Sequence, residues 1–167
     1  NMINKINKLT ESQFIKVFAN IFENASWIAH KLYIKKPFKD FKDLSEKMMN
    51  IFEETSRENQ LKILCSHPDL ADKTKISSLT KDSQKEQNEV GLNQCTKEEF
   101  EEFANLNNKY KKKFGFPFIF AVKDKSKLEI LANFRKRISC DINVEFEEAK
   151  KQVKKIASLR LNEINKK

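Results

Sequence analysis

The sequence predicts an all-α protein, a single-domain bundle of about seven to nine helices. Only two glycines and three prolines occur in 167 residues, which leaves little material for the tight turns of an all-β protein. Apolar residues recur mostly at intervals of three and four, the spacing of a helix face. A chain of this length buries enough surface to fold as one domain without a metal or disulfide. We therefore expect one domain over residues 1–167, with Asn1, which precedes Met2, foreign to the natural chain.

Four helices are expected in the first 66 residues. Thr10–Gln13 is a capping-box pattern, in which a threonine and a glutamine bond the helix start reciprocally. It precedes apolar residues spaced as one helix face, namely Phe14, Val17, Phe18 and Ile21. Three further apolar-striped stretches follow, at about residues 26–32, 40–53 and 58–65. Pro37 and Pro68 limit the second and fourth of them, because a proline disfavours helix in the residue before it.

The second half of the chain predicts four more helices and one extended segment. Two further capping boxes, Ser83–Glu86 and Thr96–Glu99, open a short helix ending at Gly91 and a longer helix. Ser126 opens another helix, and the last spans about residues 144–164. The apolar run Phe114–Val122 contains Gly and Pro, which makes it a poor helix, so we expect one short, buried extended segment there.

The net charge of +9 raises the possibility of an anionic partner. Only four of the 33 basic residues are arginine, whereas recognition of phosphates and bases favours the planar fork of arginine. The lysines are expected to form a solvated coat, with Lys111–Lys113 and Lys150-Lys151 on outward helix faces. A basic all-helical binding module for nucleic acid or an acidic protein stays as the alternative function.

The cysteines and the hydropathy pattern indicate a cytoplasmic protein. Three cysteines at unrelated spacings, Cys65, Cys95 and Cys140, support no disulfide framework, so we expect a reducing compartment. No apolar stretch is long enough to cross a membrane, and no signal peptide is visible. No HxxxH or CxxC spacing combines the histidines and cysteines, so no metal is expected, and two isolated glycines exclude a nucleotide-binding glycine loop.

His67 is the first candidate for chemistry. It is one of two histidines and is followed by Pro68, where a helix gives way to a polar loop. Histidine has the unperturbed pKa best suited to proton transfer near neutral pH, so His67 is a candidate general acid or base. The alternative is a structural histidine that bonds local backbone.

Ser83, Glu86 and Gln87 are the second candidate, because their spacing places them on one helix face. A hydroxyl, a carboxylate and an amide together can bind a urea-like group, since the carboxylate accepts two N–H donors. The alternative is that Ser83 and Glu86 only cap their helix.

Arg160 and the extended segment are the third candidate. Arg160 is the only arginine of the last helix and lies between two leucines, so it can bind a substrate carboxylate or pair with a protein carboxylate. The run Phe116–Val122 is most simply core, yet its backbone groups lack intrahelical partners and could be satisfied by a flat polar ligand.

Three ordered motifs resemble one known family. They are His67-Pro68-Asp69-Leu70-Ala71, Ser83-x-x-Glu86-Gln87-x-x-x-Gly91-Leu92 and Asn107-x-x-Tyr110-x-x-x-Phe114-Gly115-Phe116-Pro117-Phe118-Ile119. Together they are similar to the 2-oxo-4-hydroxy-4-carboxy-5-ureidoimidazoline (OHCU) decarboxylases of urate degradation. The resemblance extends upstream to Ser26-Trp27-Ile28-Ala29 with Pro37-Phe38. Downstream it extends to Arg135-x-Arg137-Ile138, Glu145 and Ile156-x-x-x-Arg160-Leu161, so it spans nearly the whole chain.

The resemblance implies an all-helical homodimer that converts OHCU to (S)-allantoin and carbon dioxide without a cofactor. His67 matches the family's proton donor, and Glu86 is expected to take part in catalysis or to orient the substrate. Arg160 matches the arginine that recognises the carboxylate. The expected substrate-binding residues are Pro68, Ser83, Gln84, Lys85, Glu86, Gln87, Phe118, Ile119, Phe120, Ala121, Val122 and Arg160.

Overall fold

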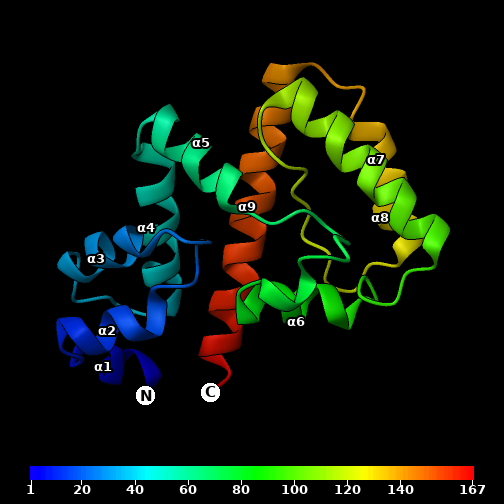
Figure 1. The fold of residues 1–167 in the computed structure, drawn as a ribbon. Coiled ribbons are helices and arrows are strands. Elements are labelled where there is room, and N and C mark those ends of the chain that lie inside the picture. Colours follow the sequence, from blue (N-terminus) through cyan, green and yellow to red (C-terminus); the bar gives the residue numbers. More distant parts are fainter. The chain divides into compact units, whose positions relative to one another are not determined.

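The computed structural model describes residues 1–167 and confirms the all-α class (Figure 1). It contains nine α-helices, one short 3₁₀ helix and no strand. Contacts divide the chain into two compact units, residues 1–66 with 154–167 and residues 67–153. None of the helices is both long and apolar enough to span a membrane.

The first unit is built from five helices and the end of a sixth. Its helices are α1 (Met2–Asn7), α2 (Glu11–Phe18), α3 (Ser26–Ile34), α4 (Phe41–Glu54), α5 (Arg57–Ser66) and the last twelve residues of α9 (Ile142–Asn165). α3 packs against both α2 and α4. Phe14 lies at the centre of this packing, fully buried and in ring contact with Phe18, Tyr33 and Phe38.

The second unit contains three complete α-helices, the 3₁₀ helix and the first half of α9. They are η1 (Ile76–Ser78), α6 (Lys81–Glu89), α7 (Lys97–Phe114) and α8 (Lys127–Arg137). α7 packs along α8 (Figure 1). Tyr110 of α7 is fully buried and touches the rings of Phe114, Phe116, Phe118 and Phe134.

Helix caps explain why most elements begin where the sequence predicts. Thr10 and Thr96 each form a complete capping box, with both reciprocal hydrogen bonds present. The Ser126 hydroxyl accepts from the Glu129 N–H at the start of α8. α7 ends at Gly115, whose φ of +80° is a left-handed conformation that glycine adopts without strain.

Several details differ from the prediction. α1 is an additional short helix, whose start is capped by the Asn1 side chain. α7 extends through Phe114, so the non-helical segment begins at Gly115. Val17, expected in the core, is 41% exposed, because α2 ends at Phe18 and turns only Phe14 and Phe18 fully inward. Lys150, expected in solvent, is 7% exposed and lies over the Phe146 ring.

The start of α6 is a further correction. Thr80, not Ser83, is its N-cap, and the Thr80 hydroxyl accepts from the Ser83 N–H at 3.3 Å. Ser83 therefore lies inside the helix, one turn before Glu86 and Gln87. The interpretation of Ser83 and Glu86 as a helix cap is wrong, and their role in a site stays a prediction.

Candidate functional site

The loop that begins at His67 is held by side chains from two helices. His67 is 8% exposed and directly follows the end of α5. Gln87 of α6 donates from Nε2 to the Asp69 carbonyl at 3.2 Å and accepts from the Ala71 N–H at 3.0 Å. Asn107 of α7 donates to the Leu70 carbonyl at 3.0 Å. Three consecutive residues after Pro68 are thus bonded through their backbone to buried amide side chains.

The predicted residues of α6 divide between the inner and outer faces of the helix. Ser83 and Gln87 are buried, at 4% and 2% exposure, and Glu86 is half-buried. Lys85 is exposed, and its ammonium lies 3.9 Å from the carboxylate of Glu89. The structure therefore bonds Gln87 to the His67 loop, keeps Ser83 and Glu86 within about one turn of Gln87 on α6, and places Lys85 on the solvent face.

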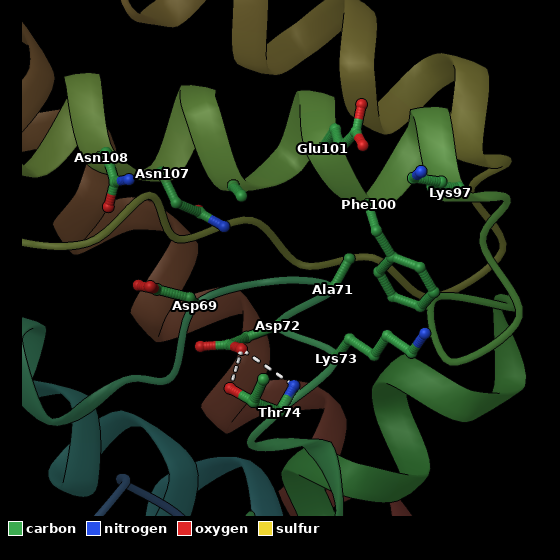
Figure 2. Close-up of a pocket in the computed structure, with 11 residues that line it drawn as sticks. Asp69, Ala71, Asp72, Lys73, Thr74, Lys97, Phe100, Glu101, Asn107 and Asn108 are labelled. Carbon is green, nitrogen blue, oxygen red and sulfur yellow. Dashed lines mark hydrogen bonds between the residues drawn. The ribbon is translucent and has the colours of Figure 1, made fainter.

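The extended segment runs beside the His67 loop, as both views show (Figures 1 and 2). Phe118, Ile119 and Val122 are buried, whereas Phe120 and Ala121 are half-buried. Part of the segment's backbone is bonded within the protein. The Ile119 carbonyl accepts from Arg137, the Ala121 N–H donates to Gln152, and the Val122 carbonyl accepts from Lys125.

A buried charged network lies behind this segment. Arg137 and Glu145 are 4% and 0% exposed, and they form an ion pair with an N–O distance of 2.5 Å. Tyr110 donates to the same Glu145 oxygen at 2.5 Å, and the Arg137 guanidinium lies 4.5 Å from the centre of the Phe118 ring. Burial, and then the hydrogen bond to Glu145, raise the pKa of the Tyr110 phenol far above its usual value.

Arg160 belongs to the first unit and is 6% exposed. Its guanidinium lies 2.9 Å from a carboxylate oxygen of Glu23, which is also buried, and donates to the Asn20 carbonyl at 3.0 Å. The sequence left two partners open for Arg160, a substrate carboxylate or a protein carboxylate. The structure contains the second, the carboxylate of Glu23.

A cavity of about 350 Å³ lies beside residues 69–74, which continue the loop that begins at His67 (Figure 2). Its lining comes from residues 69–74 and from α7 between Lys97 and Asn108, and none of the predicted site residues lines it. The Asp72 carboxylate accepts hydrogen bonds from the hydroxyl and the backbone N–H of Thr74, and the Lys73 ammonium lies over the Phe100 ring. No group of three histidine, cysteine or acidic side chains is arranged to hold a metal.

Five buried polar residues that support the candidate site were not predicted from the sequence to have a role in it. They are Asn107, Tyr110, Arg137, Glu145 and Gln152, all 4% exposed or less. The first four stand within or beside the motifs quoted above. Each is a polar residue at a helix position that faces the core, and this pattern could have identified them from the sequence. Gln152 carried no signal in the sequence.

Comparisons with known proteins identify the family of the chain. Residues 7–162 match the sequence family described as OHCU decarboxylase. The chain is 35% identical over 161 residues to the 2-oxo-4-hydroxy-4-carboxy-5-ureidoimidazoline decarboxylase of Haloferax volcanii, covering 96% of this chain and 94% of that protein. It is 40% identical over 162 residues to the "Uric acid degradation bifunctional protein" of Bacillus sp. strain TB-90. That match covers 97% of this chain but only 32% of the bifunctional protein.

A solved structure has the same fold. The crystal structure of (S)-allantoin synthase superposes with a TM-score of 0.78 at 27% sequence identity, covering 96% of this chain and 53% of that one.

Proposed function

The chain belongs to the OHCU decarboxylase family, and from this premise we propose that it converts OHCU to (S)-allantoin and carbon dioxide. The observation that carries the proposal is the match to a decarboxylase of nearly the same length, 94% of which is covered. The family match spans both compact units, which supports a single catalytic domain over the chain.

The reaction needs orientation and a proton. The bond to the carboxylate carbon breaks, carbon dioxide leaves, and the electron pair passes into the conjugated ring of the substrate, so no cofactor is required to accept it. A proton then adds to the ring carbon. An enzyme that holds the ring in one orientation delivers this proton to one face and so sets the configuration of the product.

His67 is the proton donor in this proposal. Its loop is anchored by hydrogen bonds to buried amide side chains at the three residues after Pro68, which supports a fixed position for the imidazole. Glu86 accepts N–H groups of the substrate's ureido arm, with Ser83, Gln84 and Gln87 beside it on α6. Lys85 contributes a positive charge at the solvent side of that helix.

The remaining binding roles fall to Pro68, the segment Phe118–Val122 and Arg160. The segment offers backbone N–H and C=O groups beyond those already bonded to Arg137, Gln152 and Lys125. Arg160 recognises the substrate carboxylate while Glu23 holds its guanidinium. We further propose a homodimer, as the family resemblance implies. A cytoplasmic location is proposed because an odd number of cysteines at unrelated spacings fits a reducing compartment.

A coupled assay tests the activity. Urate, urate oxidase and hydroxyisourate hydrolase generate OHCU in solution, where the family's chemistry implies uncatalysed decay to racemic allantoin. Added protein should give an optically active product, followed by circular dichroism. An unchanged, racemic product would refute the proposed activity.

Substitution of each histidine tests the proton donor. His67→Asn should abolish the optical activity of the product while the far-ultraviolet spectrum stays that of the folded protein. His30→Asn is the matched control, because His30 is exposed and its Nδ1 pairs with the exposed Glu11 at 3.4 Å. A fully active His67→Asn variant would show that another group donates the proton.

No specific observation favours a basic binding module as a second function. Arg137 and Arg160 are buried in ion pairs, and Arg135 binds the Glu102 carboxylate through two nitrogens. Binding of nucleic acid by such a module would weaken steeply with salt, and a gel-shift series beginning at low salt is the measurement for it.

A further inference from the structure

The conformation of the loop after His67 depends on side chains of the neighbouring helices α6 and α7. Leu70 and Ala71 are 7% and 3% exposed, so their backbone groups depend on protein partners rather than on water. Ala71 has a φ of +54°, in the left-handed region that residues with a side chain seldom adopt. Such a conformation persists only where the surroundings impose it. The hydrogen bonds with Gln87 and Asn107 are among the contacts that impose it here, together with the ion pair of Asp69 with Lys111.

Asn107 is the partner that can be separated from substrate binding. Gln87 stands on α6 among the proposed binding residues, so its replacement would disturb both the substrate and the loop. Asn107 stands on α7 and bonds the loop through the Leu70 carbonyl, three residues after His67.

The hydrogen bonding of Asn107 indicates that its side-chain N–H is the group that the loop requires. The side chain is 3% exposed, and its Oδ1 is buried without a hydrogen-bond partner while Nδ2 bonds Leu70. For stability alone, an apolar side chain of the same size would avoid that unpaired oxygen. What an apolar side chain cannot supply is the N–H that fixes the Leu70 carbonyl.

We propose that Asn107 is a positioning residue for the decarboxylation, one that holds His67 in register with one face of the substrate by bonding the loop at Leu70. This inference rests on the proposed function and adds a residue to it. A small displacement of a proton donor lowers the rate steeply, because proton transfer requires hydrogen-bond distance and alignment. A displaced His67 also competes poorly with proton addition from water, which reaches both faces.

The test compares Asn107→Leu with Asn108→Leu. Leucine matches the size of asparagine and lacks the donor, and Asn108 is the exposed neighbour on the same helix. We expect Asn107→Leu to lower kcat by roughly 10- to 100-fold, as for a misplaced catalytic group, and to lower the enantiomeric purity of allantoin, with KM changed less than kcat. Asn108→Leu should match the parent in all three.

Wild-type rate and optical purity in a folded Asn107→Leu variant would overturn the proposal. A fall in rate with unchanged optical purity and an unchanged pH profile would also overturn it, because this would reflect general loss of structure rather than displacement of His67.

Hydrogen exchange gives a second measurement that needs neither activity nor a stable variant. In the unmodified protein the Ala71 amide should exchange among the slow amides, since it is buried and bonded to Gln87. Fast exchange at Ala71 would overturn the proposal even if Asn107→Leu failed to fold. If the parent protein produced no (S)-allantoin, the proposed function would fail, while slow exchange at Ala71 would still show that the loop is held.

Discussion

Arg137 donates a hydrogen bond from Nη1 to the backbone carbonyl of Ile119 over 2.6 Å. The same guanidinium donates from Nε to Glu145 at 2.6 Å, so its charge is neutralised where water does not reach. Arg137 therefore ties the extended segment to α9 near the start of the proposed backbone binding site, Phe118–Val122. The ion pair positions the segment and does not itself need to touch the substrate.

Removing Arg137 should destabilise the protein strongly. Arg137→Met leaves the Glu145 carboxylate buried without its cation, which typically costs about 3–5 kcal/mol of folding free energy. Arg135→Met is the matched control on the same helix, since Arg135 pairs with Glu102 at the surface, where an ion pair contributes about 0–1 kcal/mol. Urea denaturation measures both free energies of unfolding.

A double variant separates the ion pair from the packing. Arg137→Met with Glu145→Leu removes both charges, so it should be more stable than Arg137→Met alone. Equal losses in Arg137→Met and Arg135→Met would mean that the buried pair contributes no more than a surface pair.

Tyr110 gives a prediction for alkaline pH. Its pKa is raised in the folded protein by burial and by the bond to Glu145, whereas in the unfolded chain a tyrosine ionises near pH 10. Above about pH 10 the unfolded chain therefore releases a proton that the folded protein retains, so this contribution to stability is lost as pH rises. The free energy of unfolding should fall above that pH more steeply in the parent protein than in Tyr110→Phe.

The two proteins should differ by a constant amount between pH 7 and 9. There, Tyr110→Phe should be less stable by about 1–3 kcal/mol, because Glu145 loses a buried donor. Parallel curves through pH 11 would show that Tyr110 ionises alike in the folded and unfolded states.

Gln152 should affect substrate binding through the backbone of the extended segment. Its Oε1 accepts from the Ala121 N–H at 3.0 Å, and the side chain is 4% exposed. Gln152→Met keeps the length of the side chain and removes the acceptor, so Ala121 loses its fixed position. We expect KM for OHCU to rise roughly tenfold, the effect of about 1.4 kcal/mol. Lys151→Met, at the exposed neighbouring position, should leave KM unchanged.

The all-α class and most helix starts could be predicted because their causes are local. A capping box needs only residues three positions apart, and those at Thr10 and Thr96 form as the sequence indicates. Val17 and Lys150 were assigned to the wrong environment because a periodic pattern does not specify how far each helix turns toward its neighbours. α1 has only six residues, too few for a clear periodic signal.

The candidate site was predictable only where a motif carried it. His67, Ser83 and Glu86 stand in ordered motifs, whereas the partnership of Arg137 with Glu145 and Ile119 depends on tertiary contacts that no spacing encodes. Arg160 was also the only arginine among the site residues predicted from the sequence. The structure gives it a buried carboxylate partner and places a second buried arginine against the extended segment.

The cap of α6 supplies a final prediction, which separates folding from binding within four residues. Thr80 caps the helix, so Thr80→Ala should cost about 1 kcal/mol of stability and leave kcat and KM unchanged. In Ser83→Ala the backbone N–H still donates to Thr80, because the bond does not involve the serine side chain. Ser83→Ala should therefore raise KM for OHCU while keeping α6 capped, which thermal unfolding and steady-state kinetics on both variants measure. The opposite pattern, with stability lost in Ser83→Ala and KM raised in Thr80→Ala, would restore Ser83 as the cap and remove it from the site.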